Sequence, residues 1–119
     1  MVVTGGGRGI GAAIAEELGR SGAFVVTADP LVAIDGSAAV DEPDEQTTAE
    51  RIVAAGGSAR ASAVSVTDAA AVDALFADLV AEFGAVDAVV NVAGISRPTG
   101  FADGNEADWR AVIEGHLGG

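Results

Sequence analysis

The 119-residue chain contains no cysteine, no tyrosine and no lysine. Without cysteine, disulfide bonds and thiolate chemistry are excluded. Without lysine, a Walker-type phosphate loop is excluded, because that motif needs a lysine to reach the β- and γ-phosphates. Only six basic residues accompany 18 acidic ones, which gives a net charge of -12. Nucleic acid and anionic membrane surfaces would repel such a chain, so we expect neither as a partner.

Long apolar runs are also missing. No stretch of about 18 apolar residues could form a membrane span. The first residues have the pattern of a strand and not of a basic segment followed by an apolar one, so we expect no signal peptide and a cytoplasmic protein. The length predicts a single domain over residues 1–119, and half of the residues are hydrophobic.

A glycine-rich turn near the start is the most informative stretch that is present. Residues 2–4 are typical of a strand, five glycines follow within residues 5–11, and a helical pattern comes next. Glycine permits sharp turns and lets a phosphate approach without a Cβ in the way. A helix that begins at such a turn directs its free N–H groups and positive dipole end at one point, which predicts an anion site.

The spacing of this turn is more specific than its glycine content. Gly5, Gly9 and Gly11 fit G-x-x-x-G-x-G, with Thr4 before them and Ile10 between the last two. This pattern resembles the loop of the short-chain dehydrogenase/reductase family, which binds the pyrophosphate of NAD(H) or NADP(H). An ordinary strand–helix turn is the alternative interpretation.

One carboxylate follows the second expected strand, residues 23–28. Asp29 lies eighteen residues beyond Gly11, where a dinucleotide-binding fold places the carboxylate that accepts hydrogen bonds from the ribose hydroxyls. A carboxylate there also repels a 2′-phosphate, so Asp29 favours NAD over NADP. A turn-initiating Asp before Pro30 is the alternative.

Strand and helix patterns alternate along the remaining chain. Further strands are predicted at 60–66 and 86–92, and helices at 47–55 and from a Thr67 cap to a stop at Gly84. With right-handed crossovers this order predicts an α/β fold, a Rossmann-type doubly wound parallel sheet in the order 3-2-1-4 with helices on both faces. The acidic stretch 30–46 is interpreted as a solvated loop, because its spacing does not match a calcium loop. No metal site is expected.

The ends of the third and fourth strands extend the resemblance. Ser65-Val66 stands where the family has Asp-Val, and residues 91–94 (N-V-A-G) stand where it has N-N-A-G. The serine can form a hydrogen bond with the adenine amino group, but unlike the aspartate it carries no charge. The resemblance therefore implies a cofactor-binding set of Gly5, Arg8, Gly9, Ile10, Gly11, Asp29, Ser65, Val66, Asn91, Ala93 and Gly94.

A last helix is predicted after an Asn105 cap. Trp109, His116 and Leu117 fall on one helical face, which we expect to be buried. His116-Leu117 is similar to a branch of hydroxyacyl-CoA and 17β-hydroxysteroid dehydrogenase-like members. A core histidine with satisfied hydrogen bonds is the alternative to a catalytic role.

Catalysis in the family relies on a later serine and a Tyr-x-x-x-Lys helix, and none of these 119 residues matches them. The resemblance thus predicts that no catalytic residue lies in this chain. It also predicts that the chain is a fragment that carries the cofactor-binding half of an enzyme. That enzyme would transfer hydride between NAD and a small secondary alcohol or ketone, and would be a homo-oligomer in its full-length form. The alternative is a truncated, non-catalytic dinucleotide-binding remnant.

Overall fold

The computed structural model describes residues 1–31, 36 and 46–119, so most of the acidic stretch interpreted as a solvated loop lies outside the described residues. Strands and helices alternate, and the parallel sheet has the order β3-β2-β1-β4, which confirms the predicted fold. The elements are β1 (Val2–Thr4), α1 (Gly9–Arg20), β2 (Phe24–Ala28), α2 (Thr48–Ala54), β3 (Ser58–Ser62), α3 (Ala69–Phe83), β4 (Val89–Asn91) and α4 (Glu106–Ile113).

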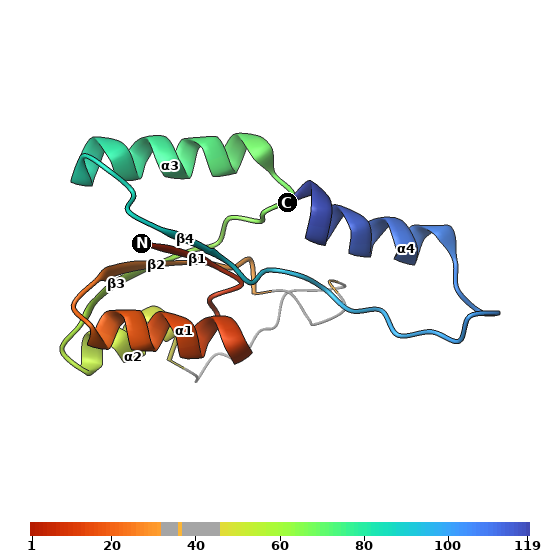
Figure 1. The fold of residues 1–119 in the computed structure, drawn as a ribbon, viewed down its shortest axis with the longest axis horizontal. Coiled ribbons are helices and arrows are strands. Elements are labelled where there is room, and N and C mark those ends of the chain that lie inside the picture. Colours follow the sequence, from red (N-terminus) through yellow and green to blue (C-terminus); the bar gives the residue numbers. More distant parts are fainter. Residues whose placement is uncertain (32–35, 37–45) are drawn as a thin grey trace.

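Helices cover both faces of the sheet, α3 on one and α1 with α2 on the other (Figure 1). Successive strand residues point to opposite faces, so Val2 belongs to the core beneath α3 and Val3 to the core beneath α1 and α2. Leu79 is the buried residue of α3 in the first core, and Ile52 is the residue of α2 that packs in the second. Because the strands are parallel and both faces are packed, the carboxyl ends of all four strands lie at the same end of the sheet.

Several element boundaries differ from the predictions by one to four residues, and β3 begins two residues earlier than predicted, at Ser58. The third strand ends at Ser62 and not at residue 66, because its partner β2 ends at Ala28 and the ladder stops with it. The side chain of Asp68, not that of Thr67, caps α3 by accepting a hydrogen bond from the Ala71 N–H. The fourth strand is shorter than predicted, three residues long.

The last helix departs most from expectation. Asn105 caps α4 as predicted, but both ends of the face expected to be buried are open: Trp109 is 64% and Leu117 79% exposed, and on that face only Val112 and Ile113 between them are partly buried. Figure 1 shows α4 beyond the strand ends and not over the sheet. A π-helical turn, Glu114–Gly118, follows α4. This turn changes the 3.6-residue period, so His116 no longer continues the stripe that the sequence pattern predicts.

Candidate functional site

A cleft of about 600 Å³ lies at the carboxyl ends of β1, β2 and β4 and extends to the last helical turn. This is where open parallel sheets bind ligands, at the point where the strand order reverses, and its volume is typical of small-molecule sites. Ten of the eleven residues of the predicted cofactor-binding set line it, namely Gly5, Arg8, Gly9, Ile10, Gly11, Asp29, Ser65, Val66, Ala93 and Gly94.

Asn91 is the member of the predicted set that does not line the cleft. It ends β4 on the exposed edge of the sheet. The ends of β1 and β4 are tied together by the buried Thr4, whose hydroxyl oxygen accepts hydrogen bonds from the N–H groups of Val92 and Ala93 at 3.1 and 3.2 Å. Thr4 is the first residue of the glycine motif, but nothing in the sequence indicates this second contact.

The glycine-rich turn leaves the start of α1 open. Arg8 occupies the N-cap position with an extended backbone, and neither a capping side chain nor an acidic residue in the first turn satisfies the N–H groups there. Gly9 has φ +56, and a Cβ on it would meet nothing within 4 Å. Ile10 lines the cleft and is 74% exposed. Free N–H groups at a helix start attract an anion.

Close packing explains another glycine of the motif. A methyl group on Gly11 would overlap the backbone carbonyl of Gly5. The first turn of α1 therefore lies directly against the end of β1, and this contact fixes where the helix N–H groups point.

The Asp29 carboxylate binds the backbone with both of its oxygens. Oδ2 accepts a hydrogen bond from the Gly7 N–H at 2.9 Å, and Oδ1 accepts one from the Leu31 N–H at 2.7 Å. The second bond is a turn of the kind that an Asp before Pro forms, so the alternative interpretation of Asp29 also holds for its local geometry. An ionised carboxylate offers about four acceptor positions, so both oxygens keep capacity toward the cleft.

Two polar contacts hold the far wall of the cleft. The Arg97 guanidinium donates to Asp108 Oδ1 at 2.6 Å, and the His116 Nε2 lies 3.0 Å from the Ile95 carbonyl oxygen. The His116 ring also covers Gly94 so closely that a methyl group on that glycine would overlap it. His116 is thus hydrogen-bonded as its alternative interpretation expects, but it is exposed and not part of the core.

In the described part of the chain, the end of the cleft that the family resemblance assigns to adenine has few polar side chains. The Ser65 hydroxyl pairs with the Thr67 hydroxyl at 2.8 Å. Arg8 makes no ion pair or side-chain hydrogen bond with any part of the chain that the structure describes, and its guanidinium is exposed beside the cleft. Its positive charge stands out in a chain of net charge -12.

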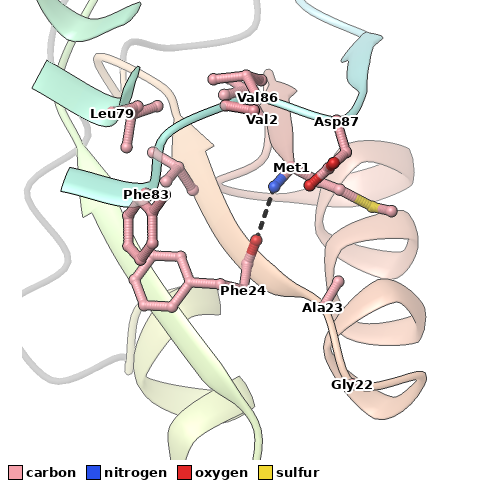
Figure 2. Close-up of a pocket in the computed structure, with 11 residues that line it drawn as sticks. Met1, Val2, Gly22, Ala23, Phe24, Leu79, Phe83, Val86 and Asp87 are labelled. Carbon is pink, nitrogen blue, oxygen red and sulfur yellow. Dashed lines mark hydrogen bonds between the residues drawn. The ribbon is translucent and has the colours of Figure 1, made fainter. Parts of the chain in front are cut away.

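A second, smaller cavity of about 390 Å³ lies at the opposite end of the sheet, where the strands begin (Figure 2). Phe24 and Phe83 pack against each other there with ring centroids 4.6 Å apart. The Met1 ammonium donates to the Phe24 carbonyl at 2.8 Å. Among residues 1–31, 36 and 46–119, no group of three or more metal-ligating side chains gathers. No helix in the same ranges is long and apolar enough to cross a membrane.

Comparison with known proteins agrees with this geometry. Residues 1–119 match the family model for short chain dehydrogenase. The chain is 40% identical over 118 residues to the short-chain reductase protein NovJ of Streptomyces niveus, and 40% identical over 118 residues to the hydroxyacyl-CoA dehydrogenase ChsB1 of Mycobacterium tuberculosis. It is 34% identical over 116 residues to the 3-oxoacyl-[acyl-carrier-protein] reductase FabG of Escherichia coli.

Solved structures give the same result. A short chain dehydrogenase from Mycobacterium avium superposes with a TM-score of 0.80 at 40% identity, covering 98% of this chain and 40% of that one. The matches to NovJ, ChsB1 and FabG cover 99%, 99% and 98% of this chain but only 41%, 35% and 42% of those proteins. The chain therefore spans about two fifths of the length of its relatives, and it belongs to the short-chain dehydrogenase family.

Proposed function

We propose that the chain is the cofactor-binding half of an NAD-dependent oxidoreductase that transfers hydride between NAD and a secondary alcohol or its ketone. The observation that carries this proposal is the cleft, in which an uncapped helix start and the carboxylate of Asp29 face the same space. One supplies N–H donors for a pyrophosphate and the other supplies acceptors for a ribose, so together they match the two ends of an adenosine diphosphate group.

The described residues fit such a cofactor. The open side of Gly9 leaves room for a phosphate against the backbone, and the Arg8 guanidinium lies beside it without a partner among the described residues. Ala93 has a small side chain where the cleft reaches the end of β4, which leaves room for the nicotinamide ribose, and the His116 ring covers Gly94 beside it. When bound, the nicotinamide ring would supply the hydride acceptor or donor.

Asp29 supports NAD over NADP. Its two oxygens are held by backbone N–H groups, so the carboxylate cannot turn away to admit a second negative charge. A 2′-phosphate would lie against this fixed charge, whereas ribose hydroxyls would donate to it.

The substrate class rests on the relatives' names. ChsB1 is named for a hydroxyacyl group and FabG for a 3-oxoacyl group, the two oxidation states of one carbon. We extend this to the present chain as a hydroxyl or carbonyl substrate, and His116-Leu117 agrees with the hydroxyacyl-CoA branch. These 119 residues hold no tyrosine or lysine, so we assign none of them the proton transfer. A cytoplasmic homo-oligomer remains our proposal for the full-length form.

The proposal is tested by titrating the purified protein with NADH and with NADPH and following nucleotide fluorescence. We expect saturable binding of NADH and weaker binding of NADPH. Absence of saturable binding of either nucleotide would overturn the assignment of the cleft. Tighter binding of NADPH would leave the cleft in place and refute the role of Asp29.

A further inference from the structure

Gly7, at the centre of the glycine-rich turn, is hydrogen-bonded through both of its backbone groups, which belong to two successive peptides. The Gly7 N–H donates to Asp29, as described above, and the Gly7 carbonyl oxygen accepts a hydrogen bond from the Thr48 hydroxyl at 3.0 Å. Thr48 is the first residue of α2 and is only 1% exposed. The two partners are 41 positions apart, so α2, packed beneath the sheet beside α1, reaches into the candidate site (Figure 1).

The Thr48 hydroxyl must donate to the Gly7 carbonyl, because a carbonyl oxygen can only accept, and the other neighbour of the hydroxyl does not compete for its proton. The Arg51 guanidinium Nη2 lies 3.1 Å from the Thr48 hydroxyl oxygen, and a guanidinium can only donate. The single hydroxyl proton is therefore directed to the Gly7 carbonyl. Arg51 is in turn held by Glu16 of α1, Nε to Oε1 at 2.8 Å, and by the Gln46 carbonyl at 2.7 Å.

This hydrogen bond sets the orientation of the peptide that links Gly7 to Arg8. In a planar trans peptide the C=O and the following N–H point in opposite directions. Because the Gly7 carbonyl points to α2, the Arg8 N–H must point away from α2, and Arg8 is the N-cap residue of α1 that lines the cleft. A flipped peptide would replace this N–H donor by a carbonyl oxygen, which repels an anion. Glycine on one side makes such a flip easier.

We propose that Thr48 is a positioning residue for the dinucleotide site: it locks the Gly7–Arg8 peptide with its N–H available to the pyrophosphate. The inference rests on the proposed function, because it presumes that the anion in the cleft is the cofactor's pyrophosphate. Thr48 acts through the backbone and has no contact of its own with the cofactor. Thr48→Val keeps the shape of the side chain and removes the hydroxyl proton, so a buried carbonyl loses its donor, and we expect about tenfold weaker NADH binding.

The experiment compares single-residue variants of the protein. Thr48→Val is measured beside Thr48→Ser, which keeps the hydroxyl, and beside Ile52→Val, which removes one methyl group from the core on the same helix. Each variant is titrated with NADH and with adenosine, which is a probe without phosphate. The temperature of the titrations is well below the lowest thermal unfolding midpoint among the variants. We expect Thr48→Val alone to lose NADH affinity, Thr48→Ser to regain it, and adenosine binding to stay the same throughout.

Two results would overturn the inference while leaving the proposed function intact. One is NADH binding by Thr48→Val at the affinity of the unsubstituted protein. The other is an equal loss of affinity in Ile52→Val, which would make the effect one of general stability. If Thr48→Val does not fold, Thr48→Ala replaces it, because it also removes the hydroxyl that donates to Gly7; weaker NADH binding supports the inference and unchanged binding refutes it. An unsubstituted protein that binds no nucleotide would instead refute the proposed function.

Discussion

The charge of Asp29 gives the sharpest quantitative prediction. Its carboxylate is fixed by two backbone donors, at 2.9 and 2.7 Å, so a 2′-phosphate on the neighbouring ribose would meet it at close range. Two unit charges about 4 Å apart repel by about 1 kcal/mol in bulk water and by more in a cleft. A phosphate with about two charges therefore costs at least about 2 kcal/mol, which corresponds to about thirtyfold weaker binding.

Asp29→Asn removes this charge at constant size. The amide keeps one acceptor oxygen and loses the other, so the glycine-rich turn loosens and both nucleotides lose affinity through that effect. The ratio of the NADPH and NADH dissociation constants cancels the shared loss and isolates the charge. We expect the ratio to fall by about thirtyfold.

The assay is a pair of fluorescence titrations at constant ionic strength. Asp87→Asn is the matched control, because it changes the net charge equally but lies by the other cavity, at the opposite end of the sheet (Figure 2). The control should keep the original ratio. A ratio that Asp29→Asn leaves unchanged would refute the electrostatic reasoning, as would an equal shift in the control.

Three further predictions concern the framework of the site. Gly11→Ala should lower the free energy of unfolding, measured in urea, by about 3 kcal/mol or more, because the new methyl group overlaps the backbone of Gly5. Gly56→Ala is the control: its methyl group would lie in open space at φ +89, so we expect a loss of only about 1 kcal/mol. Equal losses in the two variants would contradict the close packing at Gly11. Gly94→Ala should lower the free energy of unfolding by about 1–3 kcal/mol, because the new methyl group overlaps the His116 ring. In a His116→Ala background the ring is gone, so the same substitution should lower it much less. Additive effects of the two substitutions in a double-mutant cycle would contradict the contact. Thr4→Val should cost about 2 kcal/mol in thermal unfolding, since two backbone N–H groups lose their acceptor; an unchanged midpoint would contradict the tie.

The parts that the sequence predicted correctly are those with local signals. The glycine spacing fixes where β1 ends and α1 begins, and Asp29 follows a continuous apolar strand, so the position of both at one sheet edge follows from the handedness of the crossovers. The helix predicted at 47–55 illustrates the same point, because its start is a local feature: Thr47 and Glu50, three residues apart, form a capping box at the start of α2.

The parts that sequence reasoning missed depend on contacts between distant segments. Thr67 and Asp68 are both able to cap a helix, and only the observed backbone distinguishes them. The apolar period around Trp109 predicts burial, but Trp109 and Leu117 are exposed. Thr48 carries no signal of its contact with Gly7, because the two meet only when α2 packs beside α1.

The most direct test of the account is a crystal structure of the protein soaked or grown with NAD. We expect the pyrophosphate at the start of α1 over Gly9, and the adenosine ribose hydroxyls within hydrogen-bonding distance of the Asp29 carboxylate. A nucleotide bound away from the glycine-rich turn, or a cleft that stays empty at saturating NAD, would contradict the account.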